Sequence, residues 1–493
     1  MPLIPLDLPA GVFRNGTDLQ SQGRWRDANL VRWTEGTIRP FRGWRKRSDT
    51  AADAKIRGMI AWPDNVGDRH IVGGTYNKLY TWNSAGTRVD ITPAGFSTGR
   101  EDAAAFTGYG GNFYGSYAYG VARPDTARIL PATTWSMSNF GQNLIACSQD
   151  DGKVYEWNPT VGGAAAVLTN APTGNKAIIV TEERFLMCLG AGGDPRKVQW
   201  SDRENNNLWA PAATNEAGDL QLNTSGIIMS GLNVRGQTLI LTSTDAHAAN
   251  YIGPAYVYGI ERVGTSCGLV APNAAAVVDV GAFWMGTHSF FGYSGGAAQE
   301  IKCDVADYIF SDINRAQISK TFAVANSTYG EIFWFYPSSG STENDRYVVY
   351  NYVEGTWYTG DLGRTAGVDH GAFPLPIWAD ADDKKIYEHE VGFNYGSLTP
   401  FAETGPIIIG TGEAVASVTQ MLPDERTQGD VTATFKTRFY PNGTERSYGP
   451  FSMSNPVSMR FTGRQIRMRI SGARLADWRV GINRIDVVQG GKR

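Results

Sequence analysis

The most regular feature of the chain is a recurring pattern of short β-type runs that close on an aromatic residue. Residues 70–84 read HIVGGTYNKLYTWNS, in which a turn containing Asn77 separates two runs rich in β-branched and aromatic residues. Such runs joined by a tight turn predict a β-hairpin. Residues 143–159 and 184–202 repeat the pattern, and the endings LYTWN, VYEWN and KVQWSD are alike. We therefore expect repeated antiparallel strand pairs.

Weaker copies of this pattern give the chain a period. Successive closing aromatic residues are 37, 38, 43, 51, 42, 57 and 37 positions apart. Periods near about 40 to 50 residues are typical of β-propeller blades, which hide their edges by closing into a ring. The spacing predicts an all-β fold, with a propeller of about five to eight blades over residues 56–392. The closing residues are Trp82, Tyr119, Trp157, Trp200, Tyr251, Tyr293, Tyr350 and Tyr387.

Only two segments have a helical pattern. Ile309, Ile313 and Ala316 share one face if residues 305–317 are helical, and a shorter helix is expected at 101–106. Both would be inserts between blades, so helix should be a minor component. Composition agrees, because 58 glycines, 12% aromatic and 19% charged residues favour short strands and tight turns.

The pattern changes after residue 392. A hairpin with a Pro-Asn-Gly turn is expected at 431–454, and apolar residues then alternate with arginines. A period of two with one charged face predicts strands that lie on a core or on a neighbour. We predict a small C-terminal β region over residues 393–493, which completes the propeller or forms a separate domain. The alternating residues are Ile466, Met468 and Ile470 against Arg467 and Arg469.

The highest density of Arg and Trp lies in residues 14–47. Glycines and Pro40 interrupt this stretch too often for a helix, so we expect extended pieces joined by turns. Trp25, Trp33 and Trp44 lie among nine basic residues, and Arg with Trp is enriched at interface hot spots and in cation–π stacks. Residues 1–55 are therefore predicted to form an extended docking segment.

Charge is distributed unevenly, although the net charge is only -3. Residues 1–47 hold nine basic and four acidic residues, residues 436–493 hold twelve and three, and the remaining positions hold 24 and 41. Two basic ends therefore flank an acidic body. This arrangement favours contacts with other subunits over the alternative, contacts with nucleic acid.

Cellular location and redox state follow from what the sequence lacks. The N-terminus has no basic region before an unbroken apolar run, and no 18-residue apolar run occurs elsewhere, so we expect neither a signal peptide nor a spanning helix. The four cysteines form no C-x-x-C pair, and buried thiols are expected. They are Cys147, Cys188, Cys267 and Cys303.

Candidate catalytic chemistry is sparse. The chain has no G-x-x-x-x-G-K-[ST] phosphate loop and no H-E-x-x-H. His389 lies between two glutamates, where a solvated strand end is favoured over a metal site. The turn at 148–152 ahead of Trp157 partly resembles the Asp-box of sialidases, which fixes a blade hairpin and is not catalytic. We expect no enzymatic activity, no catalytic or metal-binding residues and no cofactor.

The N-terminal stretch carries a resemblance. LPAGVFRNGTDLQSQGRWRDANLVRWTEGTIRPFRGWRK, residues 8–46, resembles the start of virion structural proteins of tailed bacteriophages, in which a segment ending in R-P-x-x-G-W precedes a propeller. Further on, AFWMGTHSFFGYSGG, the 305–317 helix, EIFWFYPSSG and DRYVVYNYVEGTWY are similar in order to the tail nozzle proteins of short-tailed phages. That family is also called packaged-DNA stabilisation proteins.

The resemblance implies a non-enzymatic component of the virion tail, made in the host bacterial cytoplasm. Such nozzles form hexameric rings beneath the portal and its adaptor, close the DNA channel after packaging and let DNA pass at ejection without sequence-specific binding. They also carry the tail needle or fibres. The alternatives are a propeller-type receptor-binding protein and a glycan-degrading tail protein.

The charge pattern suggests how such a ring would form. A closing ring needs complementary heterologous surfaces, and two basic ends could meet the acidic propeller of a neighbour. Arginines that lined the channel would instead hold DNA, with log K falling by roughly 0.9 per neutralised phosphate for each log unit of salt. We therefore expect ten residues mainly at intersubunit or adaptor-facing contacts. They are Arg24, Trp25, Arg32, Trp33, Arg39, Trp44, Arg460, Arg464, Arg467 and Arg469.

Overall fold

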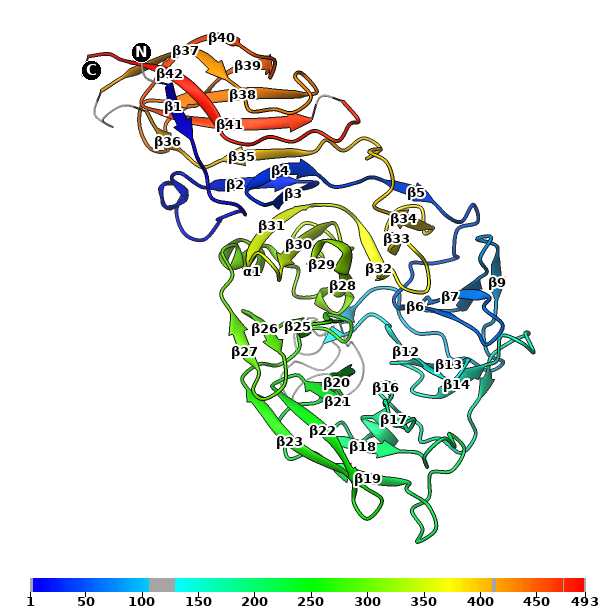
Figure 1. The fold of residues 1–493 in the computed structure, drawn as a ribbon. Coiled ribbons are helices and arrows are strands. Elements are labelled where there is room, and N and C mark those ends of the chain that lie inside the picture. Colours follow the sequence, from blue (N-terminus) through cyan, green and yellow to red (C-terminus); the bar gives the residue numbers. More distant parts are fainter. Residues whose placement is uncertain (1–2, 106–128, 410–413, 473, 492–493) are drawn as a thin grey trace, which may run out of the picture.

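The computed structural model describes residues 3–105, 129–409, 414–472 and 474–491. These residues form a ring of sheets and a two-sheet sandwich, with part of the N-terminal segment between them (Figure 1). β1 (Leu3–Leu6) and β42 (Asn483–Gln489) pair, so the two ends of the described chain lie together on the sandwich. The all-β prediction is confirmed. Among the described residues, no helix has the length and apolar character needed to cross a bilayer.

Seven four-stranded antiparallel sheets follow one another through the described part of the ring. In the first six, four consecutive strands pair in chain order. The first four sheets are β6 (Met59–Pro63), β7 (Arg69–Gly74), β8 (Leu79–Trp82) and β9 (Arg88–Asp90); β12 (Trp135–Phe140), β13 (Asn143–Ser148), β14 (Val154–Trp157) and β15 (Ala166–Val167); β16 (Ala177–Val180), β17 (Leu186–Leu189), β18 (Lys197–Trp200) and β19 (Gly218–Gln221); and β20 (Ile228–Val234), β21 (Gln237–Thr242), β22 (Asp245–Gly253) and β23 (Val257–Thr265).

The last of the seven sheets takes a strand from the other end of the chain. Its outer strand is β5, which pairs antiparallel with β34 so that Tyr387 faces Lys46 and His389 faces Trp44. The remaining three sheets are β24 (Ala275–Val278), β25 (Gly281–Met285), β26 (Phe290–Tyr293) and β27 (Gln299–Ile301); β28 (Phe322–Asn326), β29 (Glu331–Tyr336), β30 (Arg346–Asn351) and β31 (Thr356–Asp361); and β32 (Arg364–Val368), β33 (Ile377–Asp380), β34 (Ile386–His389) and β5 (Trp44–Lys46).

The first strands of the seven sheets close the ring. Each contacts the first strand of the next sheet, and β32 at the end contacts β6 at the start. All seven first strands contribute residues to one central cavity of about 290 Å³. The architecture is therefore that of a β-propeller, in which closure removes exposed inner edges.

The repeat read from the sequence has a structural origin. Of the eight predicted closing aromatics, seven lie on the third strand of a sheet, and Tyr119 lies outside the described residues. The third strand is paired on both edges, and its aromatic rings pack toward the adjacent sheet. Trp157 of β14, for example, lies 6.3 Å from Trp62 of β6 in an edge-on arrangement. The phase of the predicted repeat is thus confirmed in the described residues.

Helix is scarce, as expected. α1 (Ala306–Asp312) lies inside the predicted 305–317 helix but ends early, because Ile313 is extended and pairs with Ser338. The helix predicted at 101–106 is wrong over its described part, where β10 (Ala104–Ala105) pairs with β11 (Ile129–Leu130). The 3-10 helices among the described residues are η1 (Asp18–Ser21), η2 (Ala191–Gly193), η3 (Ile318–Lys320) and η4 (Ser327–Tyr329).

The C-terminal residues form a sandwich of two sheets beside the ring. Ile466, Met468 and Ile470 are buried and the intervening arginines are partly exposed, as the alternation predicted. This region does not complete the propeller, whose last sheet is closed by β5. One sheet contains β1 (Leu3–Leu6), β42 (Asn483–Gln489), β37 (Ala416–Leu422) and β40 (Val457–Gly463); the other contains β2 (Trp25–Asn29), β35 (Phe401–Thr404), β41 (Gln465–Gly472), β38 (Val431–Arg438), β39 (Arg446–Ser452) and β36 (Ile407–Ile408).

The N-terminal segment is divided between these two bodies. β1 and β2 belong to the sandwich, β5 belongs to the ring, and the hairpin of β3 (Val31–Thr34) and β4 (Thr37–Pro40) lies between them (Figure 1). The expected extended pieces joined by turns are present. The backbone N–H and C=O groups of β1, β2 and β5 form hydrogen bonds with sheets of the same chain. The segment therefore does not form a separate structural unit.

Candidate functional site

The junction between ring and sandwich contains a fully buried charged group. Arg32 on β3 is 1% exposed, and its Nε and Nη2 donate to Glu331 Oε1 and Oε2 at 2.8 and 2.9 Å. Its Nη2 and Nη1 also donate to Glu390 Oε1 and Oε2 at 2.6 and 3.1 Å. The ring of Tyr329 lies 3.6 Å from the guanidinium carbon. The hairpin is therefore fixed to β29 and to the end of β34.

The electrostatics of this group are those of a structural ion pair. Burial alone would lower the pKa of Arg32, but the facing charges of Glu331 and Glu390 raise it well above its ordinary value. Burial raises the pKa of Glu331, and the charge of Arg32 opposes that rise. Tyr358 donates a hydrogen bond to Glu331. Since the guanidinium uses two forks on two carboxylates, removing it would leave buried charge uncompensated.

The three tryptophans of the segment pack inside the chain. Trp33 is 1% exposed, with its ring centroid 6.1 Å from that of Trp25 and 5.7 Å from that of Tyr358 on β31. Trp44 on β5 lies 5.6 Å from the ring of His389. These contacts join the sandwich strand β2 and the hairpin to the propeller. The tryptophans act as anchors, and their partners belong to the same polypeptide.

His389 is not placed to bind a metal ion. It is buried at the end of β34, and Arg364 Nε donates to its Nε2 at 3.0 Å. Burial lowers the pKa of His389 well below its ordinary value, and the charge of Arg364 lowers it further. The imidazole therefore acts as a neutral acceptor. His389 does lie at a strand end, but the expectation that this end is solvated is wrong, because the ring stacks on Trp378 with centroids 4.0 Å apart and is buried.

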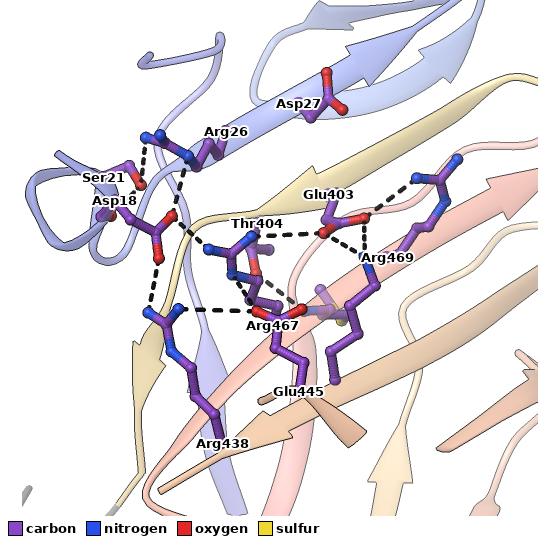
Figure 2. Close-up of polar contacts among 12 residues, drawn as sticks. Asp18, Ser21, Arg26, Asp27, Glu403, Thr404, Arg438, Glu445, Arg467 and Arg469 are labelled. Carbon is purple, nitrogen blue, oxygen red and sulfur yellow. Dashed lines mark hydrogen bonds and ion pairs between the residues drawn. The ribbon is translucent and has the colours of Figure 1, made fainter. Parts of the chain in front are cut away.

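A second charged group lies on the sandwich (Figure 2). Asp18 of η1 pairs with Arg26 Nε at 3.1 Å, with Arg438 Nη2 at 2.7 Å and with Arg467. Burial alone would raise the pKa of Asp18, but hydrogen bonds from Arg438 and Arg467 lower it. The N-terminal 3-10 helix is thereby held on β38 and β41.

The same network continues along the sheet to Glu403 of β35. Its carboxylate accepts from Lys436 Nζ at 2.8 and 2.9 Å and from Arg469 Nη1 at 3.2 Å (Figure 2). Glu445 lies 3.2 Å from Arg467 Nε. The arginine face predicted on β41 is thus neutralised by acids from other parts of the same chain.

The structure gives most of the ten predicted contact residues a partner within the chain. Arg24 pairs with Asp304 at 3.1 Å, Arg39 lies 3.7 Å from Asp477, and Arg464 lies over the ring of Tyr440. Arg460 on β40 is exposed and makes no ion pair with any described residue. The remaining six, described above, are Trp25, Arg32, Trp33, Trp44, Arg467 and Arg469.

Sequence reasoning found the basic half of the junction and missed the acidic half. Asp18, Glu331, Glu390 and Glu403 belong to no motif, and Glu331 is 299 positions from the arginine it binds. The excess of acidic residues between the two basic ends was the only feature of the sequence that pointed to acidic partners for these arginines. It indicated complementary charge without indicating whether the partner was the same chain or another copy.

The comparisons with known proteins found only distant structural likeness. No family model and no curated protein matches the chain. Solved structures with a similar arrangement include virginiamycin B lyase from Staphylococcus aureus, with 9% identity, a TM-score of 0.41, and coverage of 70% of this chain and 97% of that chain. Another is the Swd1 β-propeller domain of Myceliophteria thermophila, with 10% identity, a TM-score of 0.38, and coverage of 70% and 100%. Likeness at this level carries no argument about activity.

Proposed function

We propose that this chain is a ring-forming structural subunit of a tailed-phage virion, a tail nozzle that closes the DNA exit channel after packaging and opens it at ejection. The observation that supports the proposal is the position of R-P-F-R-G-W, residues 39–44. This motif runs from β4 into β5 and joins the junction hairpin to the last sheet of the ring. In the proposal each of the seven sheets is one blade.

The size of the central cavity bears on where DNA would pass. A cavity of about 290 Å³ is only about 7 Å across if it is taken as a cube. A DNA duplex is wider than its major groove, which is about 12 Å wide, so it does not fit in this cavity. The described residues that line it carry no ionisable side chain. In the proposed nozzle, DNA therefore passes between copies arranged in a ring, expected to be a hexamer, beneath the portal and adaptor. The tail needle or fibres bind at its other end.

One face of the sandwich remains available for a neighbouring copy. Arg460 on β40 and Arg484 on β42 are exposed on strands that flank β37 in one sheet. The positions outside the two basic ends hold 41 acidic against 24 basic residues. This exposed arginine face could therefore meet the acidic ring of the next subunit, which would give a heterologous contact that closes.

The test is the oligomeric state of the purified chain, by mass photometry and electron microscopy, alone and with its portal and adaptor. The proposal expects closed rings of the natural chain, and mainly monomers when Arg460→Gln and Arg484→Gln are combined. A matched control is Arg315→Gln, an exposed arginine outside that face. A chain that stays monomeric in both settings contradicts the proposal and favours a receptor-binding propeller.

A further inference from the structure

A polar cavity of about 620 Å³ lies on the ring, away from the junction. It opens where the β21–β22 turn, the end of β23 and the β25–β26 turn meet, so two neighbouring sheets build it. Seven of its twelve lining residues are serine or threonine. A concave surface with many hydroxyl groups offers both donors and acceptors to a polyhydroxylated ligand.

One wall of the cavity is an aromatic ring with firm support. Phe291 on β26 is partly exposed, and the ring of Trp284 is stacked against it with centroids 5.9 Å apart and planes 25° apart. Trp284 is itself buried and donates from Nε1 to the carbonyl of Cys267 at 2.7 Å. The wall therefore gives a rigid apolar face beside the hydroxyl groups.

Among the described residues that line the cavity, one cation has unused hydrogen-bonding capacity. Arg262 is 53% exposed, and its nearest acid is Asp245, 3.9 Å from Nη1 to Oδ2. Asp245 is already satisfied, since it accepts from Thr224 at 2.8 and 2.9 Å and also from Thr242. The guanidinium is thus available to an added carboxylate, whereas the buried aspartate is not free to act as a general acid.

The backbone around the cavity has one residue in an unusual conformation and one unusually close approach. Ser266 has a φ of 56°, in the left-handed region that serine rarely adopts. Gly268 packs so closely on the turn that an added Cβ would lie 2.1 Å from the carbonyl oxygen of Ser243. Backbone strain such as that of Ser266 persists only where surrounding contacts impose it, and it often occurs at binding sites.

We propose that this cavity binds a saccharide unit that carries a carboxylate. The sugar ring would lie on Phe291, its hydroxyl groups would bond to the serine and threonine side chains, and its carboxylate would pair with Arg262. The site would bind without cleaving. This inference goes beyond the nozzle assembly and does not depend on it, since the cavity lies within one chain.

The test uses two probes that differ at one carbon, galacturonate and galactose, with the purified full chain. Saturation-transfer NMR and calorimetry should detect galacturonate with a Kd on the order of 1 mM, and galactose about tenfold more weakly. Arg262→Gln should remove that difference by weakening galacturonate alone. Arg315→Gln, which removes an exposed arginine elsewhere on the ring, should change neither affinity.

Two results would overturn the inference. One is the absence of galacturonate binding at about 10 mM, well above its expected Kd. The other is equal binding of both sugars that Arg262→Gln leaves unchanged, which would show that the guanidinium does not recognise the carboxylate. Circular dichroism of each variant checks that the ring remains folded, and Phe291→Leu, which keeps an apolar side chain, should weaken both sugars together.

Discussion

At the scale of single residues, the junction depends on charges that are far apart in sequence. Arg32 binds Glu331 and Glu390, which lie 299 and 358 positions further along the chain. The sequence pattern singled out this arginine with a partner expected on another subunit or the adaptor, whereas in the structure Glu331 and Glu390 of the same chain bind it. Buried ion pairs are sensitive to removal of one member, because the other is left charged in a medium of low polarity.

Replacing Arg32 by alanine should therefore destabilise the chain strongly. We expect a loss of about 3–5 kcal/mol in the free energy of unfolding, because two buried carboxylates lose their counter-charge. Arg32→Lys should restore only part of it, since an ammonium cannot form both bidentate pairs. Urea unfolding followed by tryptophan fluorescence measures the effect. The exposed Arg42 is the matched control, and Arg42→Ala should change stability by less than about 0.5 kcal/mol.

A second residue-scale prediction concerns pH. Arg57 donates to both oxygens of Glu343 at 2.6 Å, and Lys55 lies 3.2 Å away. Burial alone would raise the pKa of Glu343, but Arg57 lowers it from an ordinary 4.5 to about 2. Because the folded value is the lower one, the stabilisation is complete above pH 4.5 and is lost as the pH falls from 4.5 to 2.

The measurement is the unfolding free energy across that pH range. This carboxylate should account for a decrease of about 3 kcal/mol between the two limits. Glu343→Gln should lower stability at neutral pH and make the acid decrease shallower by that amount. An acid profile identical in slope to that of the natural chain would show that Glu343 does not carry this pH dependence.

At the scale of elements, the critical feature is how β5 enters the ring. Gly43, inside R-P-F-R-G-W, donates from its backbone to Gly392 at 2.9 Å and accepts from Val391 at 3.0 Å. A Cβ at this glycine would lie 2.3 Å from the carbonyl oxygen of Asn394. The motif needs glycine here because two backbone segments approach too closely for a side chain, and a positive φ is not involved.

Gly43→Ala should therefore loosen β5 from β34. The expected cost is about 1–3 kcal/mol, as for other overpacked sites, and limited proteolysis should cut residues 25–47 faster than in the natural chain. Gly340→Ala is the control, because a Cβ there has open space around it. Equal cleavage rates for the two variants would contradict the role given to this contact.

At the scale of the whole molecule, the N-terminal segment joins two bodies of one subunit. Trp25 and Trp33 are buried between the sandwich and the ring, so their substitution tests the integrity of the chain before it tests assembly. The exposed arginine face of β40 and β42 is the better target for assembly, because those side chains can change without a cavity in the core. Contact between copies remains a prediction.

The sequence by itself determined the local structure. Alternating apolar residues and tight turns specify hairpins, and the aromatic at the end of each unit marked the strand that is third in its sheet. It also located the Arg and Trp anchors, and the arginine side of β41. These features depend on residues that are only a few positions apart, and the periodicity of apolar and polar residues over such short distances shows which side of a strand is buried.

Only the tertiary structure decided what those anchors contact. β5 completes the last sheet of the ring by pairing with a strand more than 300 positions away, and Glu331 and Glu390 are brought to Arg32 by closure of the propeller. A basic stretch and a distant acid have the same attraction whether they belong to one chain or two. The physical difference is the geometry of ring closure, which places the complementary charges within one subunit before any second copy arrives.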